Sequence, residues 1–149
     1  WTGRGFGVNL AVEDGLASPY SERPLRSPHN AHMTILARAG IPGLVLWAVF
    51  LLAWFGALFR TMAIARNRGH TEWAALMLFI GCYAASCIIN ASFDVALEAP
   101  MQGIWFWCLI GFGIGTTMIY RYLLGKDACQ ASEAGLPLPA GIPAVPPPA

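Results

Sequence analysis

The sequence predicts an all-α integral membrane protein with three transmembrane helices and a short interfacial helix, as part of a larger multi-span helical bundle. Of its 149 residues, 56% are hydrophobic and 11% are charged, which is too apolar for an ordinary soluble domain. Three runs carry no charge at all, over residues 41–59, 73–93 and 101–120. Each run is close to the ~20 residues that cross about 30 Å of hydrocarbon as a helix.

Residues 1–40, which precede the first run, are predicted to form an extramembrane loop that ends in a short helix. Ser27-Pro28 is typical of a helix start, with the hydroxyl as cap and proline in the first helical position. Gly40 is typical of a left-handed helix end, and Pro42 of the first turn of the next helix. We therefore expect a helix over residues 28–39 that lies along the membrane interface.

His29 would lie in the first turn of this helix, where backbone N–H groups point outward and the helix dipole is positive. An anion is favoured there and an imidazolium is disfavoured. A neutral imidazole beside an anion site is what a general base needs near neutral pH. We interpret His32, on the same helix face, as a hydrogen-bonded interfacial histidine. No third ligand has a recognisable spacing from this pair, so we predict no metal and no cofactor.

The spans are expected to pack through small residues in Gly81-x-x-x-Ala85 and Gly111-x-x-x-Gly115. The second extramembrane loop, over residues 60–72, contains three arginines and is placed in the cytoplasm by the positive-inside rule. The loop over residues 94–100 has no lysine or arginine, so it shares the non-cytoplasmic side with residues 1–40. Residues 121–149 are expected to form a Pro-rich, disordered cytoplasmic tail.

Three pieces of the chain, in this order, resemble a known signature. His29-Asn30, nine residues and then Gly40-x-x-Gly43 at the start of a span resemble the signature of the O-antigen ligase and polymerase superfamily. The upstream piece is Gly3-x-Gly5-x-Gly7, and the downstream piece is Phe93-Asp94-x-x-Leu97-Glu98-x-Pro100 followed by Phe106-Trp107. The resemblance extends over residues 3–115.

The resemblance implies transfer of a glycan from an undecaprenyl-diphosphate carrier to an acceptor hydroxyl, without a metal. It places this reaction on the periplasmic side of the bacterial inner membrane, in cell-surface polysaccharide or lipopolysaccharide biosynthesis. The implied partners are the lipid-linked donor, a glycan or lipid acceptor and the bilayer, with no nucleic acid.

His29 is the candidate catalytic residue for this reaction. Arginine suits the diphosphate because its planar fork binds phosphate oxygens bidentately and stays charged. The candidates for that task are Arg26, Arg23 and Arg4. The candidates for supporting roles are Asn30, Asp94 and Glu98, although solvation at the interface or pairing with an arginine is an alternative for the two carboxylates.

Several alternatives remain open from the sequence. A ligase and a polymerase of this superfamily differ mainly in the acceptor. A transporter fragment would be favoured by ionisable residues inside the spans, which contain none, and a purely structural membrane module is the third alternative. Because no signal peptide is recognised, we expect a C-terminal fragment that is inactive without the N-terminal remainder of the same polypeptide.

The topology can be tested by cysteine labelling. On a background without the four native cysteines, Ala17→Cys and Asn67→Cys should react with a membrane-impermeant reagent from opposite faces of the membrane. The reason is the arginine bias of the loop that follows the first span. Labelling of both positions from the same face would contradict the three-span arrangement.

Overall fold

The computed structural model describes residues 1–6, 12, 15, 30–93 and 100–133, and in these ranges it contains three α-helices and no strand. The helices are α2 (Ala31–Asn67), α3 (Thr71–Asn90) and α4 (Pro100–Glu133). All three are long and apolar enough to cross a membrane. The prediction of an all-α fold with three helices able to span a membrane is confirmed, and the larger bundle stays a prediction.

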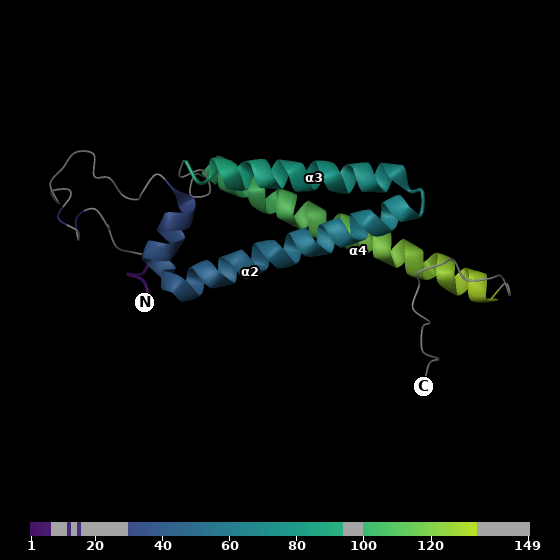
Figure 1. The fold of residues 1–149 in the computed structure, drawn as a ribbon, viewed down its shortest axis with the longest axis horizontal. Helices are drawn as coiled ribbons and strands as arrows, with labels where there is room; N and C mark the ends of the chain where they lie inside the picture. Colours follow the sequence, from purple (N-terminus) through teal and green to yellow (C-terminus); the bar gives the residue numbers. More distant parts are fainter. Residues whose placement is uncertain (7–11, 13–14, 16–29, 94–99, 134–149) are drawn as a thin grey trace, which may run out of the picture.

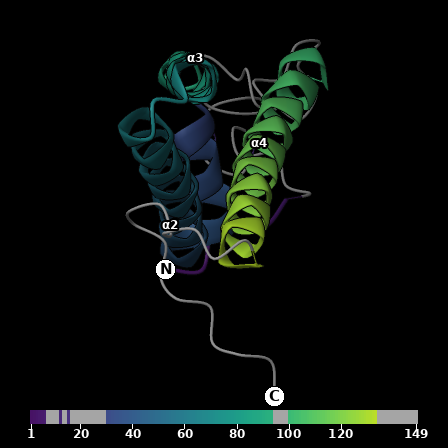
Figure 2. The ribbon, with the colours of Figure 1, turned by 90° about the vertical axis from the view of Figure 1, so that its right-hand side faces the viewer.

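Each helix packs against the other two. Figure 1 shows α3 running along one side of the molecule while α2 and α4 cross beside it. Seen from the end, the three helices form a triangle, with α3 above α2 and α4 (Figure 2). The 20 residues of α3 give a length of about 30 Å, which matches one crossing of the hydrocarbon.

The 34 residues of α4 give a length of about 51 Å, which exceeds the thickness of the hydrocarbon. The helix passes residue 120 and ends at Glu133, so the predicted disordered tail is wrong for residues 121–133. This segment is rich in helix formers, and its first proline comes only at Pro137. The rest of the predicted tail lies outside the described residues.

Helix α2 is broken at Gly40, whose φ of 70° and ψ of −167° are not helical. The predicted left-handed stop is therefore confirmed. Pro42 follows in the first turn of the next helical segment, where its missing N–H removes no hydrogen bond. The first segment, 31–39, turns sharply away from the rest of α2 (Figure 1).

This first segment starts later than predicted. Asn30 is extended, with φ −159° and ψ 113°, and its side chain accepts a hydrogen bond from the N–H of Met33. The N-cap is therefore Asn30, and the predicted helix start at Ser27-Pro28 is wrong. Asparagine satisfies an N-terminal N–H group as well as serine does.

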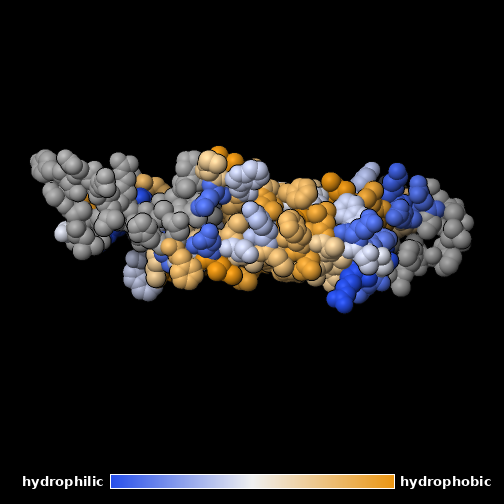
Figure 3. Space-filling model, turned by 90° about the horizontal axis from the view of Figure 1, so that it is seen from above, coloured by the Kyte–Doolittle hydropathy of each residue, from blue (hydrophilic) through white to orange (hydrophobic). Residues whose placement is uncertain are grey.

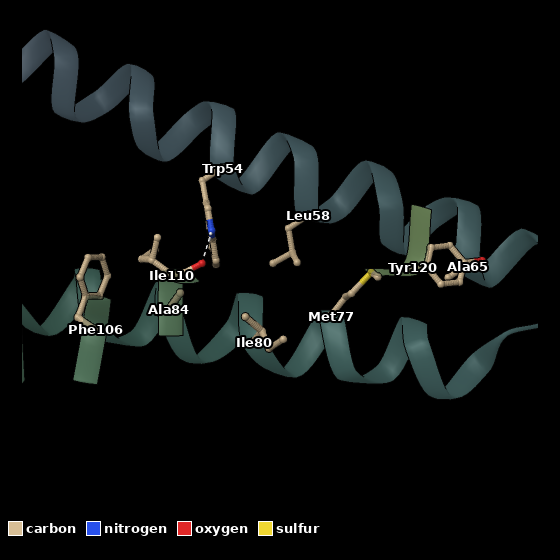
Figure 4. Close-up of a cluster of buried hydrophobic side chains, with 9 residues drawn as sticks. All are labelled: Trp54, Leu58, Ala65, Met77, Ile80, Ala84, Phe106, Ile110 and Tyr120. Atoms are coloured by element: carbon tan, nitrogen blue, oxygen red, sulfur yellow. Dashed lines mark hydrogen bonds between the residues drawn. The ribbon is translucent and has the colours of Figure 1, made fainter. Parts of the chain in front are cut away.

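The interior of the bundle is an apolar cluster to which all three helices contribute (Figure 4). Trp54 of α2 donates from its indole N–H to the carbonyl of Ile110 on α4, at 3.1 Å. A Cβ built on Gly113 would lie 2.5 Å from the Trp54 ring. The packing of Trp54 against α4 therefore requires glycine at position 113.

Among the described residues, the predicted small-residue contact is confirmed at Gly81 on α3 and wrong at Gly111 and Gly115 on α4. A Cβ on Gly81 would lie 3.2 Å from the Phe59 ring, so α2 does pack closely there. Gly111 and Gly115 have open space where a Cβ would stand. Spacing alone predicts a small-residue face, but the Trp54 side chain decides which face of α4 is used.

Large apolar side chains cover the outside of the bundle. Figure 3 shows hydrophobic residues over the middle of the molecule and many hydrophilic ones toward the end where α2 meets α3. Exposed examples include Leu46, Leu52, Phe79, Trp105 and Phe112. In water such a surface would be costly, whereas hydrocarbon is a suitable solvent for it.

The glycine pair on α4 provides a matched test of the packing. Gly113→Ala should lower the free energy of unfolding in a detergent–SDS titration by about 1–3 kcal/mol, because the added methyl group overlaps the Trp54 ring. Gly111→Ala, in open space on the same helix, should change it by less than about 0.5 kcal/mol. Equal effects of the two substitutions would contradict this packing.

Candidate functional site

Asn30 joins the start of α2 to the end of α3. Its side-chain N–H donates to the carbonyl of Ser92 at 2.7 Å, while its side-chain oxygen accepts from the N–H of Met33 at 3.0 Å. The next N–H, of Ala31, donates to the carbonyl of Ala91 at 2.8 Å. One side chain thus caps a helix and connects residues that are 62 positions apart in sequence.

His32 also connects the start of α2 to the end of α3. Its Nδ1 accepts a hydrogen bond from the indole N–H of Trp47 at 3.2 Å, and its Nε2 lies 3.3 Å from the carbonyl of Ile88. With Nδ1 as acceptor, the neutral ring carries its proton on Nε2 and donates to Ile88; this tautomer is assigned from the partners. Both ring nitrogens are occupied, which agrees with the interpretation of His32 as a hydrogen-bonded histidine.

The glycine-rich N-terminal segment crosses α2 at its break. The N–H groups of Arg4 and Gly5 donate to the carbonyls of Ala37 and Arg38, both at 2.9 Å. In the other direction, the N–H of Ile41 donates to the carbonyl of Trp1 at 3.1 Å. These bonds pair backbone groups that the end of one helical segment and the start of the next leave free.

Glycine is required on both sides of this crossing. Gly3 has a φ of 72°, and a Cβ on it would overlap the carbonyl of Arg38. A Cβ on Gly40 would overlap the carbonyl of Trp1. At Gly3 the close approach is therefore to the chain's own backbone.

Two cavities flank the crossing. The first, of about 480 Å³, is lined by Phe6, Ala31, Thr34, Ile35, Arg38, Trp47, Phe106 and Trp107. Its walls are mainly aromatic and apolar, and the Arg38 guanidinium donates to the carbonyl of Phe6 at 3.0 Å. The second, of about 370 Å³, lies between residues 1–4 and the break of α2 and includes Arg4 in its lining. A cation thus stands in the wall of each cavity.

Of the predicted site residues, the structure describes Arg4 and Asn30. The others lie outside the described residues: His29, Arg26, Arg23, Asp94 and Glu98. In the described part of the chain, no group of three or more His, Cys, Asp or Glu side chains is arranged to hold a metal ion. The described residues thus supply the frame of the candidate site, which consists of two fixed chain crossings and two adjacent cavities.

One expectation about His29 needs correction. The first turn of the helix begins at Ala31, with Asn30 as its cap, instead of at Pro28 as predicted, and His29 itself lies outside the described residues. The helix start is also less available to an anion than predicted. Two of its free N–H groups, on Ala31 and Met33, already donate to oxygens of the protein.

Arg38 and Trp47 line the larger cavity, and Trp47 was not among the predicted site residues. The sequence placed Arg38 in the last turn of a short helix, where its charge suits the helix dipole. Arg38 is about 70 residues from Phe106 and Trp107 in the sequence, so their contact with one cavity could not be predicted from the sequence. A clue was available for Trp47, because an indole at the start of a membrane span often needs a polar partner.

Comparisons with known proteins give no relative for this chain. No protein-family model matches it, and neither a curated protein nor a solved structure does.

The two roles of Asn30 can be separated by substitution. Asn30→Asp keeps the capping oxygen but places a carboxylate against the Ser92 carbonyl, so it should lower the free energy of unfolding by about 1–3 kcal/mol. In Asn30→Ser the hydroxyl can still cap the helix, and the amide donor to Ser92 is lost without a repulsive charge. This substitution should therefore lower the free energy of unfolding less than Asn30→Asp. Hydrogen exchange at the Met33 N–H should stay slow in both variants. An Asn30→Asp protein as stable as the native one would contradict the link to α3.

Proposed function

We propose that this chain is part of a lipid-linked glycan transferase of the O-antigen ligase and polymerase type, in the inner membrane of a bacterium. The proposal rests on one observation. The three sequence pieces that carry the resemblance meet at one end of the bundle, where Gly3 lies against Gly40 and Asn30 binds the backbone of Ser92. Phe6 of the upstream piece and Phe106 and Trp107 of the downstream piece also line one cavity, which supports a shared site.

Chain connectivity extends this argument to the candidate catalytic residues. His29 is bonded to Asn30, and Asp94 follows Ser92 by two residues. Consecutive Cα atoms are about 3.8 Å apart. The hydrogen bond between Asn30 and Ser92 therefore joins the two described segments that are adjacent in sequence to His29 and Asp94. This supports the assignment of both residues to one site on the periplasmic side.

The larger cavity suits the lipid part of the donor. A polyprenyl chain needs an apolar path that opens from the membrane, and Trp47, Phe106 and Trp107 offer aromatic walls for it. Arg38 in the same wall places a positive charge where the diphosphate would follow the chain. Arg26, Arg23 and Arg4 are the proposed further ligands of the diphosphate.

The proposed reaction assigns a role to these side chains at each step. The acceptor oxygen attacks the anomeric carbon of the glycan and the bond from this carbon to the diphosphate oxygen breaks. His29 takes the acceptor proton as general base. The undecaprenyl diphosphate leaves with its negative charge, which the arginines stabilise, and this electrostatic contribution is proposed to be the larger catalytic effect.

A ligase and a polymerase would share this chemistry and differ in the acceptor, so the proposal includes both. Transport of a solute is the weaker alternative, because the charge-free cores of the three spans offer no ionisable residue to a solute path.

His29 and His32 provide the test of the proposed function. In membranes that carry matched amounts of each variant, His29→Ala should abolish glycan transfer. His32→Asn keeps an oxygen that can accept from the Trp47 indole, so it should retain substantial transfer. A chelator should affect neither result. Full transfer by the His29→Ala protein would exclude the catalytic assignment, and chelator-sensitive loss in both variants would indicate a metal site instead.

A further inference from the structure

The opposite end of the bundle carries an excess of positive charge. We call residues 60–73 and 120–130 the basic end. It contains two acidic residues, Glu72 and Asp127, and five basic ones: Arg60, Arg66, Arg68, Arg121 and Lys126. Within the described part of the chain, none of the five forms a salt bridge. The charge of the basic end is thus not neutralised by the described residues.

Arg121 is held in place on one edge only. Its Nε–H donates to the hydroxyl of Thr61 at 3.2 Å, and this buried hydroxyl donates to the carbonyl of Ala57 at 2.8 Å. A guanidinium has five N–H donors. The other four on Arg121 have no partner among the described residues, so α2 fixes the group while its outer edge stays available.

Arg68 lies in the same neighbourhood. The hydroxyl of Tyr120, the residue before Arg121, is 3.0 Å from Nδ1 of His70, and its ring lies 5.5 Å from that of Trp73. Arg68 is two residues before His70 in the turn that contacts this hydroxyl. Figure 4 shows Tyr120 beside Ala65, at the end of α2 that leads into the turn. Arg68 and Arg121 thus lie at the same end of the bundle, and neither binds a carboxylate in the described part of the chain.

The surroundings indicate what kind of anion fits. Phe59, Tyr122 and Leu123 are exposed apolar side chains next to the basic end in sequence, and Figure 3 shows hydrophilic and hydrophobic surface in contact there. We propose that Arg68 and Arg121 bind the phosphate of an anionic phospholipid, whose acyl chains lie on the adjoining apolar surface. Each arginine near such a phosphate contributes about 1 kcal/mol to binding, which is about fivefold in affinity.

Lipid binding to the purified, delipidated chain tests this site. Native mass spectrometry should show that phosphatidylglycerol binds more tightly than phosphatidylcholine. Arg68→Gln and Arg121→Gln should each weaken phosphatidylglycerol binding about fivefold. Thr61→Val keeps the charge but removes the anchor of Arg121, and should weaken binding less. Millimolar inorganic phosphate should not displace the lipid, because it lacks the acyl chains.

Arg60→Gln is the matched control, since Arg60 is exposed on the same end and forms no hydrogen bond or salt bridge with its side chain in the described part of the chain. It should bind phosphatidylglycerol like the native chain. Equal loss in all three arginine variants would show diffuse surface attraction and overturn the site, as would equal binding of the two lipids. Displacement by phosphate would show a site for the free anion. Circular dichroism checks the fold, and Arg68→Gln, on the turn, carries the test if Arg121→Gln does not fold.

Discussion

The architecture of the site end depends on the backbone pairing at the break of α2. When Gly40 takes a positive φ, the carbonyls of the preceding turn lose their helical partners. Residues 1–5 supply the replacement donors, from Arg4 and Gly5. Unpaired backbone groups are expensive in or beside hydrocarbon, so the break and the crossing segment require each other. The absence of a side chain at Gly3 and Gly40 is what allows this approach.

The need to pair backbone groups also fixes the other end of segment 31–39. The last carbonyls of α3 accept from the side chains of Asn30 and His32 and from the N–H of Ala31. The segment is thereby tied to α3 at its start and to the N-terminal residues at its end. Side chains on a segment fixed at both ends keep their geometry, which is the condition for positioning a substrate without a further ordering cost.

The spans were predictable because a helix needs about 20 apolar residues to cross the hydrocarbon, and three charge-free runs of about this length stand in the sequence. The stop at Gly40 was predictable because a glycine before Pro42 is a local signal. The true start of α2 was not, since Ser27 and Asn30 are both good caps. The choice depends on the Ser92 carbonyl, 62 residues away. The extension of α4 beyond residue 120 was not predicted, because the charged residues from Arg121 onward end the membrane-spanning run but do not end the helix.

The candidate site divides in the same way. Asn30 and the glycine motif were found from local patterns, but their roles as tertiary connections could not be. Arg38 and the aromatic side chains of the larger cavity come from both ends of the chain, and no periodicity links them. Contacts between residues that come together only because helices cross cannot be predicted from a single sequence, unless the residues belong to a recognisable motif.

The junction between α2 and α3 is tested most directly by disulfide cross-linking in membranes. On a background without native cysteines, Ala31→Cys and Ala91→Cys should cross-link rapidly, because the N–H of Ala31 lies 2.8 Å from the carbonyl of Ala91. Ala31→Cys with Ser86→Cys, more than a turn away along α3, should not. If the first pair fails to cross-link, or if both pairs react equally, the three sequence pieces do not meet as described.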